Sequence, residues 1–322
     1  MTAPDAQPKP DDQWSTVMSG DSKYITAATF NFEQNGFGDP ALRRRAYRLL
    51  KSLDLHLLFR QEMNGAADGE QQIRYEAEEA LGMRSWLGER SCTAVMADTK
   101  VFAPRGQWPS PWTGFKLPPT AVTFQLRDAG PQSTPVIAVA GHAVYNSPLL
   151  REIETEMLTG FNDKWVTLPD GVSRKHAVMI GGFDGNSYPH NLVAGDPALP
   201  KLTDIKDGPH RAHRSRPGSD GVRVVHQGPH ETLDTARIVD VGRHLALTRG
   251  QQAAVGPTML AYDTHGPDSR VDWLCSSQQL LPVWEHVEVI DAQAVSDHNI
   301  VVGRMRRDHL ADLLCDLKIT AA

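Results

Sequence analysis

The sequence predicts a strand-rich α/β fold, in which apolar strands alternate with amphipathic helices. Four runs have the length and composition of buried strands: YITAATF, LHLLF, PVIAVAGHAVY and HAVMIGGF. Apolar residues at helical spacing follow the first and the third of these runs, at 41–53 and 149–158. At 322 residues the chain can bury a large core. Strand-rich folds of about 250 to 300 residues often form one domain.

Capping residues mark where two of the helices begin. Asp39 precedes the helix at 41–53, and Ser147 with Pro148 precedes the helix at 149–158. The apolar residues expected to face the core are Leu42, Ala46, Leu49, Leu50 and Leu53 in the first helix, and Leu149, Leu150, Ile153, Met157 and Leu158 in the second. Further helices are expected at 69–81 and 307–315, and further strands at 93–103, 121–126, 270–276, 286–290 and 299–304.

The composition is that of an ordinary soluble protein, with 40% hydrophobic and 22% charged residues. A net charge of −6 gives no general basic surface for nucleic acid, although a bound cation and a local basic rim can supply the field that a nuclease needs. The cysteines Cys92, Cys275 and Cys315 lack CxxC spacing and are expected to be reduced packing residues. The absence of a long apolar run and of a signal peptide predicts no membrane span and a cytoplasmic location, and no obligate protein partner is indicated.

Three segments are expected along the chain. Residues 1–20 predict a disordered tail, residues 21–308 the main domain, and residues 309–322 a C-terminal helix and tail. Between about 190 and 230 the composition shifts to Pro, Gly, His and Arg, which predicts an irregular insertion. Its HRAHRSR run at 210–216 lacks the Cys partners of a structural zinc site, so a basic patch that meets an anionic substrate is favoured over a metal site.

Polar residues recur where the apolar strands end, and this pattern carries the functional prediction. In chain order they are Asn31, Gln61-Glu62, His142, Asp184-Gly185-Asn186, Asp272 and Asp297-His298. Taken alone, the last pair could be a surface turn in which Ser296 and Asp297 cap backbone N–H groups. Strand ends in one sheet can meet, however. A cleft of carboxylates, amides and imidazoles fits a hard cation such as Mg²⁺ or Mn²⁺ better than zinc.

In this order the motifs resemble the endonuclease/exonuclease/phosphatase superfamily, whose fold is called DNase I-like. The matching pieces are TFN at 29–31, LLFRQE at 57–62, VAGH at 139–142, MIGGFDGNS at 179–187, SRVDWLCSS at 269–277 and SDH at 296–298. The resemblance covers about residues 24–304. It implies a four-layered α/β (α+β) sandwich, in which two mostly antiparallel sheets pack against each other between helices.

The resemblance implies a metal site at one edge of the sheets. Glu62 corresponds to the principal ligand of a Mg²⁺ or Mn²⁺ ion, and Asn31 and Asp297 correspond to residues that complete or adjust the site. These three residues are the expected ligands of the metal cofactor.

The resemblance also implies catalytic roles. Asp184 and Asn186 correspond to a pair that positions or deprotonates the attacking water and binds the phosphate, although this chain reads Gly-Phe-Asp-Gly-Asn where the family usually reads GDFN. The two residues are still two apart, so their side chains can share a face of a strand. His298 corresponds to the catalytic histidine, Asp272 to the carboxylate that fixes its tautomer, and His142 to a second histidine that acts as general acid or phosphate ligand.

The implied activity is Mg²⁺-dependent hydrolysis of a phosphoester by in-line attack of water on phosphorus, with either Asp184 or His298 as the base. A nuclease or phosphodiesterase that acts on DNA or RNA is favoured by the two histidines and by the basic run at 210–216. The alternative is a phosphatase or phosphodiesterase that acts on a small molecule or a lipid headgroup, which the acidic net charge suits. A non-catalytic binding protein on the same fold is the third hypothesis, and the retention of every catalytic residue type opposes it.

Overall fold

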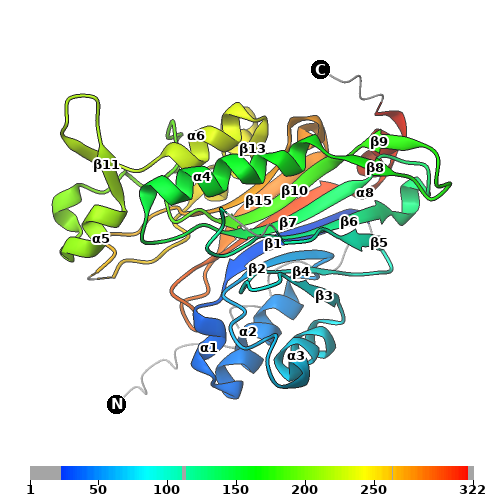
Figure 1. Cartoon of the computed structure of the whole chain (residues 1–322), viewed down its shortest axis with the longest axis horizontal. Helices are drawn as coiled ribbons and strands as arrows, with labels where there is room; N and C mark the ends of the chain where they lie inside the picture. Colours follow the sequence, from blue (N-terminus) through cyan, green and yellow to red (C-terminus); the bar gives the residue numbers. More distant parts are fainter. Residues whose placement is uncertain (1–22, 111–113, 263, 318–322) are drawn as a thin grey trace, which may run out of the picture.

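Two six-stranded sheets form the centre of the protein in the computed structural model, which describes residues 23–110, 114–262 and 264–317 (Figure 1). In order across the first sheet, the strands are β15 (Trp284–Ile290), β16 (Ile300–Arg306), β1 (Tyr24–Asn31), β2 (Leu57–Gln61), β4 (Ala94–Ala97) and β3 (Arg84–Leu87). In the second they are β13 (Ile238–Asp240), β14 (Asp272–Ser277), β10 (Val178–Asp184), β7 (Val136–His142), β6 (Thr120–Leu126) and β5 (Phe102–Gln107). The tail expected at 1–20 lies outside the described residues.

Each sheet is mostly antiparallel and contains one parallel pair. That pair is β1 with β2 in the first sheet and β10 with β7 in the second. Two short antiparallel hairpins stand apart from the sheets, β8 (Trp165–Thr167) with β9 (Arg174–His176) and β11 (Ser215–Pro217) with β12 (Arg223–Val225).

Helices cover the outer faces of both sheets and complete four layers (Figure 1). Against the first sheet pack α2 (Pro40–Ser52) and α3 (Gln72–Leu81), and against the second pack α4 (Pro148–Thr159) and α6 (Gly228–Thr235). The other helices are α1 (Gln34–Phe37), α5 (Gly208–His213), α7 (Val241–Arg249) and α8 (Arg307–Asp316). The four-layered α/β sandwich expected from the sequence is confirmed.

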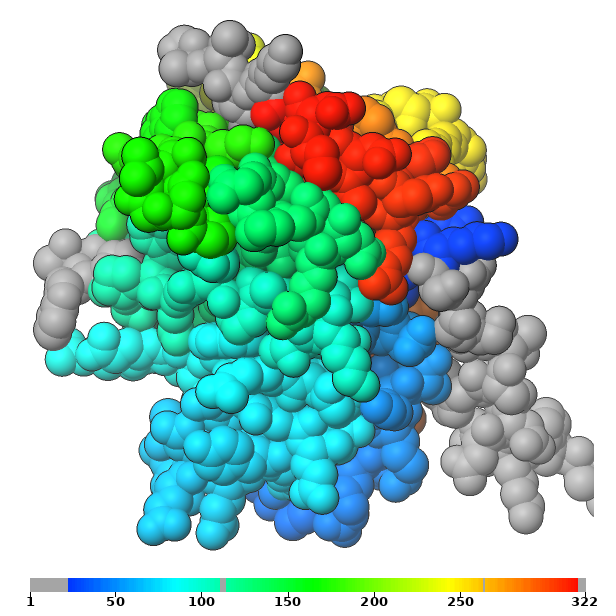
Figure 2. Space-filling view, turned by 90° about the vertical axis from the view of Figure 1, so that its right-hand side faces the viewer, coloured from blue at the N-terminus to red at the C-terminus, as the bar shows by residue number. Residues whose placement is uncertain are grey.

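The largest buried cluster fills the space between the two sheets. Alternate residues of each strand enter it, for example Ile25 and Ala27 of β1, while Ala28 and Phe30 face the helices. Leu310 and Leu314 of α8 belong to the same cluster. Figure 2, which views the molecule from the right-hand side of Figure 1, shows α8 (red) beside the β8/β9 hairpin (green).

Two expectations about elements are wrong. The single strand expected at 93–103 is two strands, β4 and β5, in different sheets, because the chain turns at Asp98, whose carbonyl accepts from Val101 and Phe102. In α4, Leu149, Ile153 and Met157 were expected to face the core, but they are exposed.

The face that α4 buries is instead largely polar. Its buried residues are Arg151, Glu154, Thr155 and Leu158. Glu154 accepts from the backbone N–H groups of Val144 and Lys116, and Arg151 donates to the carbonyl oxygen of Val144. These bonds satisfy loop backbone groups at the surface of the second sheet, which stabilises polar side chains in an otherwise apolar position.

The insertion expected to be irregular between about 190 and 230 contains regular elements. It holds α5, the β11/β12 hairpin and the first residues of α6, and α5 and β11 project from one end of the sandwich (Figure 1). In the part of the chain that the structure describes, no helix is long and apolar enough to cross a lipid bilayer.

Candidate active site

The strand register places three of the predicted site residues side by side on adjacent strands of the second sheet. Asp184 at the end of β10 pairs with His142 at the end of β7 and with Asp272 at the start of β14. Along each strand, a residue two or four positions away belongs to the core between the sheets. Because side chains an even number of positions apart in a strand share a face, all three side chains point into the space between the sheets. Asn31, at the end of β1, faces them from the opposite sheet.

Asp184 is the centre of this group and is almost completely buried. Its Oδ2 atom accepts a hydrogen bond from Asn31 Nδ2 at 2.9 Å and lies 3.4 Å from His142 Nε2. Its Oδ1 atom accepts from the backbone N–H of Asn186 at 2.9 Å. Burial opposes ionisation of Asp184, but the two histidines and these hydrogen bonds hold the pKa of its carboxyl below the ordinary value.

Asn186 turns back toward Asp184 because its backbone is in the left-handed region, with φ of 45°. Its Nδ2 atom donates to the carbonyl oxygen of Ala143 at 3.0 Å. The two predicted members of the Asp-x-Asn pair therefore lie together, in spite of the altered order of the motif.

His298 and Asp272 form a buried pair, with His298 Nδ1 and Asp272 Oδ2 2.8 Å apart. The Thr258 hydroxyl accepts from the N–H groups of Val271 and Asp272 and so fixes the start of β14. Burial opposes protonation of His298, but Asp272, Asp184 and Asp297 outweigh it and raise the pKa of the imidazole to about 10. These carboxylates therefore favour the protonated form of the His298 ring.

His142 is also buried, and its environment also favours the charged ring. Burial opposes protonation, but contacts with Cys92, whose Sγ atom is 3.7 Å from His142 Nδ1, and with Asp184 raise the pKa of His142 to about 9. The carboxylate of Asp184 thus lies near two histidines whose pKa values are raised.

The three predicted metal ligands lie close together at the same edge of the two sheets. Asn31 Nδ2 donates to Glu62 Oε1 at 3.2 Å, and Glu62, with φ of 55°, is held by the backbone N–H of Gln34 at 2.7 Å. The pKa of Asp297 is raised, first by burial and then by Glu62 and Asp184. The pKa of Glu33 is raised in the same way, by burial, Asp297 and Glu62.

These residues fit a divalent cation. Asn31 Oδ1 is buried and has no hydrogen-bond partner among the described residues, so it is free to act as a ligand. The neighbouring carboxylates that raise the pKa values of Asp297 and Glu33 are stabilised by a positive charge, and oxygen donors are those that Mg²⁺ prefers. A second group, Asp184, Asp272 and His298, brings ligand atoms within 4.8 Å of one another and is a rival place for a cation.

No family model and no curated protein matches this sequence, but solved structures match its fold. An endonuclease/exonuclease/phosphatase from Bacteroides vulgatus shares 13% identity over 88% of this chain and 98% of its own, with a TM-score of 0.55. An AP endonuclease from Archaeoglobus fulgidus shares 11% identity over 87% and 99%, with a TM-score of 0.54. A mannosyl-6-phosphatase from Bacteroides thetaiotaomicron shares 15% identity over 87% and 98%, with a TM-score of 0.51.

The chain therefore has the DNase I-like fold. The resemblance indicated by the sequence motifs is confirmed at this level. Identities of 11 to 15% establish the fold alone, so the chemistry must be argued from the residues of this chain.

Within this DNase I-like fold, Ser296 connects the predicted metal ligand Asn31 to the predicted catalytic residue His298, a contact that the sequence did not reveal. Its hydroxyl donates to the carbonyl oxygen of Asn31 at 2.9 Å and accepts from the N–H groups of Glu33 and His298 at 3.1 and 3.2 Å. The SDH motif is therefore more than a local turn, because its serine joins the loop before β16 to the end of β1.

Residues of the insertion also reach the site. Arg214 is buried, and its Nη2 atom donates to Asn186 Oδ1 at 3.5 Å. His265 is close enough to His298, Asp184 and Arg214 for their charges to affect its pKa. The basic run at 210–216 was a signal for Arg214, whereas nothing in the sequence pointed to His265.

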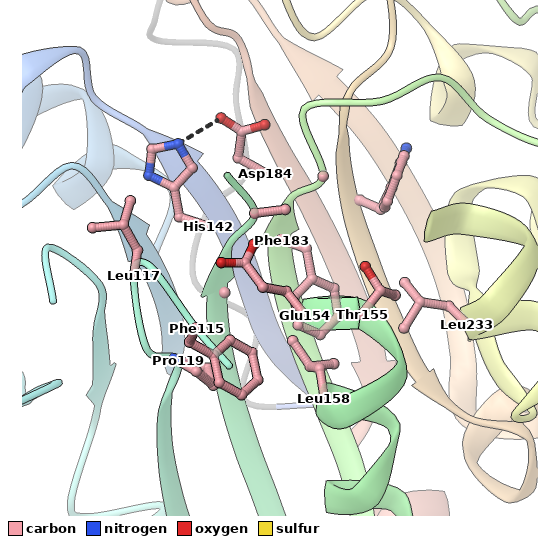
Figure 3. A pocket seen from close by; sticks show the side chains of 14 residues that line it. Phe115, Leu117, Pro119, His142, Glu154, Thr155, Leu158, Phe183, Asp184 and Leu233 are labelled. Carbon is pink, nitrogen blue, oxygen red and sulfur yellow. Dashed lines mark ion pairs between the residues drawn. The ribbon is translucent and has the colours of Figure 1, made fainter. Parts of the chain in front are cut away.

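A small apolar pocket, with a cavity volume of about 30 Å³, opens beside His142 and Asp184 (Figure 3). Its walls include Phe115 and Leu117 from the loop before β6 and Leu158 from α4. The ion pair of His142 and Asp184 lies at one end of this pocket, so a polar end adjoins apolar walls.

Proposed function

We propose that this protein is a Mg²⁺-dependent phosphoester hydrolase of the nuclease or phosphodiesterase type. The observation that carries the proposal is the buried group of Asp184, His142, His298 and Asn31 at one edge of both sheets. A negatively charged phosphate needs cationic and hydrogen-bonding groups around it, together with one base for water. Structural neighbours named as an endonuclease and as a phosphatase support phosphoester chemistry without choosing between these substrates.

Asn31, Glu62 and Asp297 would hold the cation. When bound, a divalent cation supplies positive charge that neutralises phosphate oxygens and lowers the barrier to attack. The chain's own residues do the rest. Asp184, a carboxylate with a lowered pKa, accepts the proton of the attacking water, and Asn186 holds that carboxylate in place.

The two histidines complete the reaction. As the bond from water oxygen to phosphorus forms, the bond from phosphorus to the leaving oxygen breaks, and an imidazolium can donate a proton to that oxygen. Both His142 and His298 have pKa values raised enough to carry this proton at neutral pH. Asp272 keeps His298 oriented through its bond to Nδ1.

The test is a substrate panel with His298→Gln and the exposed His309→Ala as matched control. Bis(p-nitrophenyl) phosphate, DNA, RNA, p-nitrophenyl phosphate, inositol phosphates and phospholipids are incubated with Mg²⁺ or with EDTA. We expect Mg²⁺-dependent cleavage of diesters, a loss of at least about 100-fold in His298→Gln, and wild-type rates in His309→Ala. Equal rates in wild type and His298→Gln would mean that the measured activity comes from a contaminant.

The second candidate is a hydrolase of small-molecule or lipid-headgroup phosphates. The net charge of −6 favours it, because a nuclease usually gains affinity from basic surface that this chain lacks overall. Cleavage of p-nitrophenyl phosphate, inositol phosphates or phospholipids with no cleavage of DNA or RNA in the same panel would select this candidate.

A further inference from the structure

A row of five rings lies along the insertion side of the site. From Tyr145 the contacts run to His213 and then to His210, each with ring centroids 6.3 Å apart. They continue to His265 at 4.5 Å and to Tyr262 at 6.1 Å. We call these five residues the ring row. The tyrosines at its two ends are 51% and 65% exposed, and the imidazoles between them are partly exposed.

The ring row borders the proposed catalytic centre. Arg214, which follows His213 in the chain, donates to Asn186. The segment that carries Tyr262 begins at Met259, which pairs with His298 through a backbone bridge. Lys116 lies over the ring of Tyr145 at 5.2 Å and adds a positive charge at that end.

Two members of the ring row, His210 and His213 of α5, are held by neighbouring residues. The buried Arg151 of α4 donates to the carbonyl oxygen of His213 at 2.6 Å and to Nδ1 of His226 at 3.1 Å. Asp207 caps α5 and bonds the ring of His210 at 2.8 Å. A preformed surface costs little ordering entropy when it binds a partner.

The chemistry of the ring row favours flat, neutral partners. Burial and the neighbouring cations lower the pKa of His265 to about 4, and burial also lowers the pKa of His213. These rings are therefore uncharged at neutral pH and offer π-faces and edges. Tyrosine and histidine are among the side chains on which unpaired nucleic-acid bases stack.

We propose that the ring row binds the unpaired bases of a single-stranded nucleic acid whose backbone enters the catalytic site. Lys116 then meets the backbone phosphates at the Tyr145 end. In a duplex the bases are stacked on one another, so this surface selects single strands. The inference rests on the proposed function, because it names the substrate of the same site.

The test compares two oligonucleotides of equal length and charge, one of thymidine and one in which every base is replaced by an abasic sugar. Their affinities are measured by fluorescence anisotropy in EDTA, for wild type, for the double variant Tyr145→Ala/Tyr262→Ala, and for Tyr75→Ala. Tyr75 is a matched control because it is 54% exposed on α3, a helix of the other outer layer. Thermal melting checks that each variant is folded.

We expect wild type and Tyr75→Ala to bind the thymidine strand about tenfold or more tightly than the abasic strand. In the double variant the two affinities should become nearly equal, and a duplex should bind wild type no better than the abasic strand does. Equal binding of both strands by wild type, binding of neither, or an unchanged ratio in the double variant would overturn the inference. Hydrolysis of bis(p-nitrophenyl) phosphate by wild type separates the two proposals, since its absence contradicts the proposed function and leaves base-dependent binding as a separate result.

Discussion

At the scale of single residues, the site exists because side chains alternate between the two faces of a strand, and the polar residues occupy positions on the inner face. Asn31, His142, Asp184 and Asp272 sit at positions that an uninterrupted strand would fill with core residues, and each points between the sheets. Several of their polar groups bond to one another, whereas Asn31 Oδ1 and Asp272 Oδ1 have no hydrogen-bond partner among the described residues, so the cost of burying the group is only partly recovered. The sequence could predict these residues because a polar side chain that ends a buried apolar strand is conspicuous.

Asn31 should control metal affinity, because its Oδ1 atom is unpaired while its Nδ2 atom holds both Asp184 and Glu62. We predict that Asn31→Ala raises the Mg²⁺ concentration needed for half-maximal activity by about 10- to 100-fold. Mg²⁺ titrations of the hydrolysis rate measure this shift. Asp272→Asn should lower the rate without a comparable shift, and the reverse pattern would place the cation in the group of Asp184, Asp272 and His298.

At the scale of elements, α4 shows where sequence periodicity fails. Leu149, Ile153 and Met157 have the helical spacing of a core face, yet Arg151 and Glu154 are the buried residues. The spacing of apolar residues cannot reveal that loop backbone groups beneath the helix need polar partners. The same limit applies to Ser296 and Arg214, whose contacts join segments far apart in the sequence.

This difference predicts that two similar substitutions in α4 have very different effects on stability. Leu158→Ala should lower the free energy of unfolding by about 2 to 5 kcal/mol, because the leucine is only 8% exposed and packs in the cluster of the second sheet. Leu149→Ala should change it by less than about 0.5 kcal/mol, because that side chain is 70% exposed. Denaturant unfolding of both variants measures the two values, and comparable losses would restore the original prediction for this helix.

The attachment of the insertion to α4 predicts a pH dependence of stability. His226 is buried between Arg151 and Glu152, and burial together with Arg151 lowers its pKa to about 4. Above pH 6.5 the ring is neutral in both the folded and the unfolded chain. As the pH falls below that value, only the unfolded chain gains the proton, so stability is lost.

Between pH 7 and pH 5 this difference is worth about 2 kcal/mol for His226 alone. We therefore predict that the free energy of unfolding falls by about that much more in wild type than in His226→Asn. Urea unfolding at the two pH values measures it, with the exposed His309→Asn as control. An equal fall in wild type and His226→Asn would show that His226 is protonated in the folded protein.

At the scale of the whole molecule, apolar strands and helix caps predicted individual elements, and the resemblance carried by the ordered motifs predicted the four layers. The sequence could not predict that β4 and β5 belong to different sheets, or that the short β13 pairs with β14, because such pairings depend on distant partners. The strand register that places His142, Asp184 and Asp272 side by side is also a property of the assembled sheet. That register turns separate strand ends into one site.

The central claim is that carboxylate and amide oxygens at this edge hold a cation for phosphoester hydrolysis. Its most direct test is the rate of bis(p-nitrophenyl) phosphate hydrolysis as a function of Mg²⁺ concentration, for wild type and Glu62→Gln. We predict saturable, EDTA-sensitive hydrolysis by wild type, and at least about a 100-fold lower rate in Glu62→Gln at the same Mg²⁺ concentration. Wild-type hydrolysis that persists in EDTA, or an unchanged rate in Glu62→Gln, would contradict the claim.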